Sequence, residues 1–503
     1  RVEMKSNLNL IHELSGYKTY QCEFNQFNSF VFSLGSDNNY IWLLGIHCLD
    51  QNSQLTKLRY YFFDFEEKDQ FCVEVELPSG EKLYSISHLW KNASFYERQL
   101  IQQTGLTLKK DYRFKEPIKD DRDYLDLQTV EFPSNLKKNT HLLDLRMDKN
   151  KVAKANFRKG LFHIGLEDIL SGLDWNLSFQ TLENYFPKRG LLWSFLISRG
   201  IELKENIEIP DRAKAIRMVT FELNRILDHL LYFDQVAVDF KSAVLIDFTR
   251  LWIKKFQSLM ISYSGNEFGL NLIRPGGTTL DLGQAWSSRM IDELSMLEKH
   301  LVALIKDYLL TFKFNENALN FCLVEKEDVI KWGLTGPVAR SVGVNLDLRK
   351  RDPFYFYQDV EFDIPMGVQG TLYDLFLVKI EEILQSSRII VQVLDNLPTG
   401  NFISPDLPTD FLHNLDQVDE QNYKKSVENY LNFSSLNATA FIESPRGVIG
   451  VDLIKSDEKQ LVRLLGSHFA EPSYLERFLE NKDIMNVFPL WTSMDIDLRE
   501  VER

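Results

Sequence analysis

Residues 210–231 read PDRAKAIRMVTFELNRILDHLL, and this stretch gives the clearest indication of the fold. Pro210 suits the start of a helix, because the first turn needs no backbone N–H from that position. Apolar residues then recur every three or four positions: Ile216, Val219, Leu223, Ile226, Leu227, Leu230 and Leu231. This spacing places them on one face of an α-helix. The sequence therefore predicts a long helix whose apolar face is buried in a core.

The chain that follows shows the same helical period twice more. A second long helix is predicted by Ile291, Leu294, Leu297, Leu301, Leu304 and Ile305. Residues 373–396 predict a third helix, which ends at Leu397-Pro398 because proline cannot continue it. Between these two helices, residues 333–370 contain several Gly and Pro and predict loops and short strands. Residues 439–503 predict strands, a short helix and an extended tail.

The N-terminal region has the composition of β-strands. Residues 20–34, 40–48 and 58–65 are rich in Phe, Val, Ile and Tyr, and residues 71–77 alternate between apolar and polar side chains. A helix is predicted over residues 94–104, where Gly105 ends it. The predicted fold class is therefore α+β, with a small α+β domain followed by a large, mainly helical domain that carries small β elements.

Charged side chains dominate from Lys109 to about Lys138, and the hydrophobic period disappears there. Such a stretch is usually a solvated connection between domains. We therefore divide the chain into a small α+β domain over residues 1–115, a charged linker over 116–138 and a large domain over 139–503.

The composition excludes several classes of function. A formal net charge of -14 leaves no excess of cations for nucleic acid or an anionic membrane surface. The four cysteines form no C-x-x-C pair, which favours reduced, mostly buried thiols over a zinc or iron–sulfur site: Cys22, Cys48, Cys72 and Cys322. We find no bilayer-spanning apolar run and no signal peptide, although the chain begins at Arg1 and a short leader could be missing. Membrane association is therefore expected only through partners.

Motifs that carry a chemical mechanism are scarce. The sequence has no G-x-x-x-x-G-K-[ST], no G-x-G-x-x-G after a strand and no H-E-x-x-H. Glu222, Arg225 and His229 share one stripe of the first predicted helix, which favours a solvated or interhelical salt-bridge face. Asp497 and Glu500 are expected in an exposed tail. From these residues alone, the prediction is a two-domain protein without a metal site.

The order of short motifs after residue 160 resembles the quinone-site subunit of respiratory complex I and the large subunit of membrane-bound nickel–iron hydrogenases. The motifs are FHIGL at 162–166, IR at 216–217 with ELNRILDHL at 222–230, IRPGG at 273–277, LTGPVARSVGVNLDLR at 334–349, FDIPMG at 362–367 with YD at 373–374, ESPRG at 443–447, and DI at 495–496 with EVER at 500–503. Each motif is weak alone, but together they follow the order of the family over about 340 residues.

The first domain is similar to the small α+β peripheral subunit of complex I. The residues that carry this resemblance are FYER at 95–98 ahead of Gly105, and YRFK at 112–115. The resemblance therefore implies a fusion of the small peripheral subunit with the quinone-site subunit. It also implies a bacterial or archaeal origin.

Hydrogenases of this superfamily hold nickel and iron through four cysteines. The matching positions here are Leu191, Ser194, Asp497 and Glu500, none of which carries sulfur. Soft metal ions of this kind need thiolate ligands. The resemblance therefore implies that this chain binds no nickel–iron centre, and no metal site is expected.

The residues that serve quinone in complex I are also replaced. The family's quinone-binding Tyr matches Leu191, which has no hydrogen-bond donor, and the loop before His163 leaves only His141 as a displaced remnant of the family's His. Asp239 matches an Asp behind that His, with a solvated helix-end carboxylate as the alternative interpretation. Asp239 and His141 are therefore the candidate catalytic residues, and His163 and Arg274 belong to motifs near the cavity.

The resemblance implies two alternative functions. In the first, the chain is a subunit without nickel–iron chemistry that docks an iron–sulfur peripheral subunit to an ion-translocating membrane arm with antiporter-like subunits, and its catalytic cavity is degenerate. In the second, it is an active oxidoreductase subunit that reduces a quinone or another acceptor in an altered site. Quinone is the candidate ligand, and the iron–sulfur cluster is expected in a neighbouring subunit. The implied location is the cytoplasmic face of the cell membrane, as a peripheral subunit.

Overall fold

The computed structural model divides the chain into two compact units. The first unit comprises Arg1–His163, Glu325–Thr335 and Leu465–Glu502, and the second comprises Ile164–Val324 and Gly336–Leu464 together with Arg503. The structure describes residues 8–14, 17–36, 41–64, 67, 69–109, 128–133, 140–157, 163–306, 324–405, 436–455, 460–466, 472–495 and 497–501. No helix within these ranges is both long and apolar enough to cross a membrane. The predicted boundaries at 115 and 138 stay a prediction.

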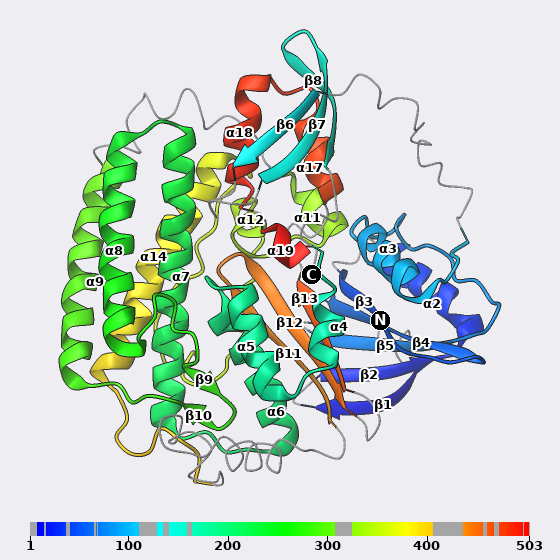
Figure 1. The fold of residues 1–503 in the computed structure, drawn as a ribbon, viewed down its shortest axis with the longest axis horizontal. Helices are drawn as coiled ribbons and strands as arrows, with labels where there is room; N and C mark the ends of the chain where they lie inside the picture. The colour runs from blue at the N-terminus through cyan, green and yellow to red at the C-terminus, as the bar shows by residue number, and fades with distance from the viewer. Residues whose placement is uncertain are drawn as a thin grey trace. The chain divides into compact units, whose positions relative to one another are not determined.

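The first unit is built on a five-stranded sheet in the order β1-β2-β5-β4-β3. Its strands are β1 (Asn9–Leu14), β2 (Tyr17–Cys22), β3 (Ile41–Gln51), β4 (Leu55–Asp64) and β5 (Asp69–Pro78). Strands β2 and β5 pair in parallel, and the other neighbours are antiparallel. The helices α2 (Phe24–Ser36) and α3 (Ala93–Thr104) share one apolar core with the sheet (Figure 1).

Helix α2 corrects the strand that the sequence predicted over residues 20–34. Only the start of that stretch is a strand, and residues 24–36 are helical. Phe27, Val31 and Leu34 are almost fully buried, so the buried positions recur every three or four residues. This period belongs to a helix, and the abundance of Phe and Val concealed it because composition alone favours a strand.

A second sheet of the first unit has the order β6-β7-β8 and comprises β6 (Gln128–Pro133), β7 (Thr140–Asp148) and β8 (Lys151–Phe157). The unit's other helices are α11 (Lys326–Trp332), α17 (Pro472–Leu479), α18 (Ile484–Ser493) and α19 (Leu498–Val501). The extended, exposed tail predicted for the C-terminus is therefore wrong. Val487, Leu490 and Met494 are buried at helical spacing, which is the reason that this segment is helical.

The second unit contains a bundle of four long helices (Figure 1). They are α7 (Asp211–Asp239), α8 (Ala243–Ser264), α9 (Gln284–Leu304) and α14 (Leu372–Asp395). Three of the four correspond to the long helices that the sequence predicted. Helix α14 begins at a capping box, in which Thr371 Oγ1 accepts a hydrogen bond from the backbone of Asp374 and the Asp374 carboxylate accepts one from Thr371 N.

Shorter elements complete the second unit. The helices are α4 (Leu166–Ser171), α5 (Trp175–Tyr185), α6 (Gly190–Glu205), α12 (Gly336–Ser341) and α13 (Leu348–Arg351), and the strands are β9 (Ile273–Arg274), β10 (Gly277–Thr278), β11 (Leu436–Ser444), β12 (Gly447–Lys455) and β13 (Gln460–Gly466). The short strands predicted within 333–370 are wrong, because the regular elements that the structure describes there are the helices α12 and α13. The buried side chains of α12 include Arg340, whose partners lie far away in the sequence.

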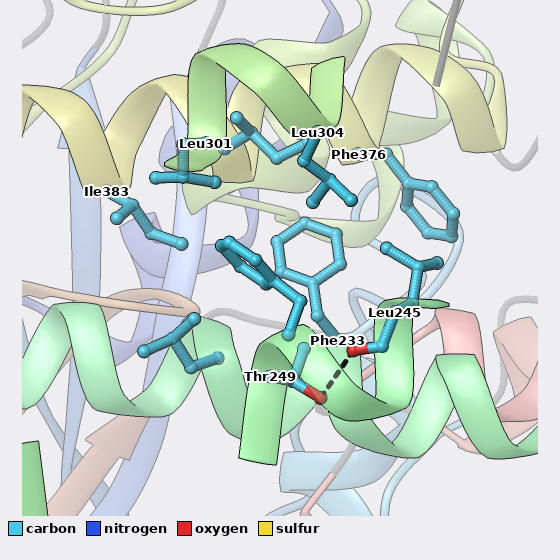
Figure 2. A pocket seen from close by; sticks show the side chains of 10 residues that line it. Phe233, Leu245, Thr249, Leu301, Leu304, Phe376 and Ile383 are labelled. Atoms are coloured by element: carbon cyan, nitrogen blue, oxygen red, sulfur yellow. Dashed lines mark hydrogen bonds between the residues drawn. The ribbon is translucent and has the colours of Figure 1, made fainter. Parts of the chain in front are cut away.

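A small cavity lies between the four long helices (Figure 2). Its volume of about 10 Å³ is close to the least that a single water needs. The lining is apolar apart from Thr249, whose hydroxyl donates to the carbonyl of Leu245 at 2.8 Å. A water there would find too few polar partners. We therefore interpret this cavity as a packing defect and not as a ligand site.

Candidate functional site

Helix α7 carries a stripe of ionisable side chains: Glu222, Arg225, Asp228 and His229. Their exposed fractions are 0%, 0%, 2% and 0%. The sequence left two alternatives for part of this stripe, a solvated face and an interhelical one. Burial this complete excludes the solvated alternative, because charged groups this deep need partners from neighbouring elements.

Glu222 is held by three donors from other elements. Tyr357 Oη donates to it at 2.5 Å, Ser386 Oγ at 2.6 Å and Arg349 Nη1 at 3.0 Å. Burial alone would raise the pKa of this carboxyl group, but the guanidinium groups of Arg349 and Arg225 lower it below its usual value. Glu222 is therefore an ionised, fully paired carboxylate.

Arg340 joins two further carboxylates. Its Nη2 lies 2.7 Å from Glu382 Oε1, and its Nη1 lies 2.7 Å from Glu443 Oε1. The same Nη1 donates to the carbonyl of Leu346 at 2.7 Å. Burial raises the pKa of Glu443, and the nearby Asp347 carboxylate adds to this effect. One guanidinium thereby connects helix α12, helix α14 and strand β11.

His229 lies between two charged residues of α14. Its Nε2 is 2.8 Å from Glu382 Oε2, and its Nδ1 is 3.4 Å from Lys379 Nζ. Burial and the Lys379 charge lower the pKa of His229 to about 4. The ring is therefore neutral at pH 7, and because the ammonium group can only donate, Nδ1 accepts and Nε2 carries the proton donated to Glu382.

Asp228 ties α7 to the turn that follows β11. Arg446 Nε lies 3.1 Å from Asp228 Oδ2, and Arg225 Nη2 donates to the carbonyl of Glu443 at 2.6 Å. We call the following side chains the charge network, all of them buried except the partly exposed Arg446: Arg189, Glu222, Arg225, Asp228, His229, Arg340, Asp347, Arg349, Lys379, Glu382, Glu443 and Arg446. Its carboxylates are paired with guanidinium groups, so the network stabilises one arrangement of the helices and does not offer ligands to a metal.

The positions that match nickel–iron cysteines in the second unit are both buried on α6. Ser194 Oγ donates to Glu183 Oε1 at 2.6 Å, and Glu183 in turn pairs with Arg274 Nη1 at 2.8 Å. Leu191 is 1% exposed. Arg274 Nη2 also donates to Asn271 Oδ1 at 2.7 Å. Ser194 and Arg274 are thus joined through Glu183, and the hydroxyl of Ser194 already has a partner.

The backbone of the turn that carries Arg274 is held by hydrogen bonds from a buried arginine. Arg217, which is fully buried, donates to the carbonyls of Arg274 and Gly277 at 2.7 and 2.8 Å and pairs with Glu202 at 2.7 Å. A side chain at Gly277 would lie 2.3 Å from the Phe402 carbonyl oxygen, so only glycine fits there. Residues 273–278 are therefore a tight β-hairpin, and their role is to place the Arg274 side chain.

The remaining predicted residues lie on other elements of the chain. Asp239 is the last residue of α7, half-buried, and lies about 15 Å along the helix from His229. His141 is in β7, and its side chain lies outside the described residues. His163 is exposed and belongs to the first unit, as do Asp497 and Glu500, and Glu500 is only 5% exposed. The prediction of an exposed position is therefore wrong for Glu500.

Three of the four cysteines lie within the described residues. Cys22, Cys48 and Cys72 are buried thiols outside any disulfide, as predicted, and Cys322 lies outside the described residues. Within the described ranges, no group of three or more His, Cys, Asp or Glu side chains is arranged to hold a metal ion. Leu191 offers no ligand atom, and Ser194 offers only a hydroxyl that is already hydrogen-bonded. These two residues do not fit a nickel–iron centre, which needs thiolates.

Comparisons with known proteins agree with the two parts of the chain. Residues 253–503 match the family model of the 49 Kd subunit of respiratory-chain NADH dehydrogenase, and residues 21–121 match that of the 30 Kd subunit. The chain is a fused peripheral-arm subunit of the complex I family. Both halves of the fusion that the motifs indicated are therefore confirmed.

Curated relatives carry the names of single and fused components of the same enzyme. The fused C/D component of NADH-quinone oxidoreductase from Acidiphilium cryptum is 24% identical over 504 residues, which cover 89% of this complex I subunit and 85% of the relative. The D component of the enzyme from Magnetococcus marinus is 28% identical over 374 residues, covering 71% and 92%. The fused C/D component from Bdellovibrio bacteriovorus is 24% identical over 381 residues, covering 68% of each chain.

Sequence reasoning missed most of the charge network of this complex I subunit. It identified three members of the α7 stripe but not their partners Arg349, Glu382 and Glu443, which lie 127, 153 and 218 residues away. The signal that could have revealed the network is that the ionisable residues of α7 are interleaved with its apolar positions. A helix that is apolar on most sides is usually buried on all of them, so its charged residues are buried as well.

Proposed function

We propose that this chain is a subunit of a complex I-like membrane complex that serves docking and structure, with a catalytic cavity that is silent. The observation that carries this proposal is the local replacement of the reactive groups. Ser194 Oγ is bonded to Glu183 at 2.6 Å, and Leu191 presents only hydrocarbon. Neither position supplies a thiolate for nickel or a free donor for a quinone headgroup.

The partners in this proposal are an iron–sulfur peripheral subunit and an ion-translocating membrane arm with antiporter-like subunits. The names of the relatives, which are D and C/D components of NADH-quinone oxidoreductases, support an assembly with other subunits of such an enzyme. Since the iron–sulfur cluster belongs to the neighbouring subunit, this chain binds no cofactor of its own. Its place is the cytoplasmic face of the cell membrane, which it reaches through its partners.

The alternative function is reduction of a quinone or another acceptor in an altered site. The observation that favours it is Asp239, a half-buried carboxylate at the end of α7 that could hold a proton close to a bound acceptor. Reduction of a quinone consumes protons together with electrons, so such a site needs at least one proton-carrying group. Asp239 matches the family position for such a group, whereas Leu191 does not.

The test uses the complex purified from membranes through a tag on this chain. Nickel content and the turnover of a short-chain ubiquinone are measured for the wild type, Asp239→Asn and Ser194→Ala. Asp247→Asn, an exposed carboxylate on α8, is the matched control. A silent cavity predicts no nickel and turnover within about twofold of wild type for all variants. A tenfold loss with Asp239→Asn alone, equal to about 1.4 kcal/mol in the barrier, would favour the alternative.

A further inference from the structure

The segment 359–369 reads DVEFDIPMGVQ and lies at the surface of the second unit. Its Val368 is 81% exposed, more than any other large hydrophobic side chain that the structure describes, and Met366 is 50% exposed. Single exposed apolar residues are common and need no explanation. This pair is different because the backbone that carries it is fixed at many points.

The Asp374 carboxylate fixes the tip of the segment. It accepts hydrogen bonds from the backbone N–H groups of Val368, Gln369 and Thr371 at 3.1, 3.3 and 3.1 Å. Gly367 N donates to the carbonyl of Arg340 at 2.9 Å. Val368 is therefore presented on a rigid loop, so a partner that buries it loses little conformational entropy on binding.

Two glutamines of α14 fix the rest of the segment. Gln392 accepts from Glu361 N at 2.8 Å and donates back to the Glu361 carbonyl at 2.7 Å, while Gln385 accepts from Asp363 N at 3.0 Å. Along residues 359–363, buried and exposed side chains alternate. Val360 and Phe362 point inward and are buried.

The exposed positions among residues 359–363 are all acidic: Asp359, Glu361 and Asp363. Their side chains form no ion pair or hydrogen bond with any residue that the structure describes. Asp359 ends the preceding turn, where its backbone N–H donates to the carbonyl of Phe356 at 3.0 Å, so three exposed carboxylates lie within five residues of the chain. The closest cation found against this segment is Lys350, whose Nζ lies 4.1 Å from the Phe362 ring centroid.

We propose that segment 359–369 is a docking strip for another protein subunit, one that offers a small apolar pocket for Val368 and Met366 beside a row of Lys or Arg side chains. Charge complementarity identifies the partner, because carboxylates without internal partners gain most from cations that are brought to them. An anionic membrane surface is the wrong partner, since the strip would be repelled from it. The inference rests on the docking role proposed above and assigns it to named residues.

The first experiment locates the partner in the intact complex. A photoreactive benzoylphenylalanine is placed at Val368, and the membrane complex is irradiated and digested. The expected cross-link joins this chain to one peptide of another subunit that contains at least two Lys or Arg. A cross-link to lipid, to an acidic peptide or to no subunit would overturn the proposal.

The second experiment measures the energetics of the contact. Two variants of the full chain are made: the single variant Val368→Asp, and a triple variant that combines Asp359→Asn, Glu361→Gln and Asp363→Asn. The partner subunits that stay bound after washes from 50 to 500 mM salt are then quantified. Val368→Asp is expected to weaken retention at least tenfold at all salt concentrations. The neutralised triple variant is expected to weaken it about threefold to tenfold at low salt only, because salt screens exposed charges.

The matched control neutralises three exposed acids elsewhere on the second unit: Asp247→Asn, Asp292→Asn and Glu298→Gln on α8 and α9. It removes the same charge and is expected to leave retention unchanged. Equal loss in both triple variants would mean that net charge, and not this strip, binds the partner, and would overturn the proposal. Nickel content and acceptor turnover, which test the silent cavity, are measured separately from partner retention. If the docking strip is refuted, the silent-cavity proposal still stands, and if the silent cavity is refuted, the docking strip still stands.

Discussion

Replacement of Arg340 by Met tests whether the charge network stabilises the second unit. The side chain is fully buried, and it donates to Glu382 at 2.7 and 3.0 Å, to Glu443 at 2.7 Å and to the carbonyl of Leu346 at 2.7 Å. Met keeps a similar volume, so little cavity is created. What Arg340→Met leaves behind is a pair of buried carboxylates that have lost their shared cation.

Removing one partner of a buried ion pair usually costs about 3–5 kcal/mol, because the remaining charge stays desolvated. Arg340 serves two carboxylates, so we expect the upper part of that range. Arg250→Met is the control: Arg250 pairs with Asp234 at 3.1 Å, but its side chain is 61% exposed. An exposed pair contributes about 0–1 kcal/mol.

Two compact units make a single global unfolding transition unsafe to assume, so the assay is local. Native-state hydrogen exchange of the full chain, read from peptides of α14, reports the free energy of opening that element. Arg340→Met is expected to speed exchange there by more than a hundredfold. Adding Glu443→Gln should recover about 1–3 kcal/mol, because the two residues are coupled. A loss below about 1 kcal/mol, or strictly additive effects, would refute the reasoning.

Three further predictions concern single residues. Burial and Lys379 lower the pKa of His229 to about 4 in the folded protein. Between pH 4 and about 6.5 the unfolded chain therefore binds more protons than the folded protein, so stability falls as the pH falls through that range. His229→Gln should remove about 1.4 kcal/mol of this loss per pH unit, measured as the opening free energy of α7 peptides by native-state hydrogen exchange at pH 7, 6 and 5, and an unchanged slope would contradict it. Thr371→Ala removes the cap of α14 and should cost about 1 kcal/mol in the same hydrogen exchange assay, while Thr371→Ser should cost little. Burial and Glu23 raise the pKa of Cys22 to about 11, so its peptide should show almost no alkylation by iodoacetamide at pH 8, and rapid labelling would disprove the burial.

The long helices could be predicted from the sequence because each carries its own evidence. Helix α14 spans Leu372–Asp395 against a prediction of 373–396, and its capping box, apolar period and following Pro398 are all local signals. Helix α2 was missed for the opposite reason. Its Phe-rich composition suggested a strand, and the helical burial of Phe27, Val31 and Leu34 became clear only against the sheet.

The candidate site was predictable only as far as motifs reach. Short family motifs mark Ser194 and Arg274 as residues near one cavity, and that role stays a prediction. Their actual connection runs through Glu183, which belongs to none of those motifs. A side chain that accepts from Ser194 at one oxygen and from Arg274 at both has no signature in the sequence, since such pairing depends on how α5, α6 and the β-hairpin pack.

The charge network and the cavity positions can be perturbed independently, which decides how the proposed function can be tested. Ser194 is hydrogen-bonded to Glu183, and Glu183 to Arg274. The network ties α7 to α12, α14 and β11 through other side chains, with Arg340 at its centre. Ser194→Ala therefore removes one hydrogen bond at a cost of about 1 kcal/mol and leaves the ion pairs in place. Loss of turnover in that variant would report on chemistry at the cavity, whereas loss in Arg340→Met would report only on the scaffold.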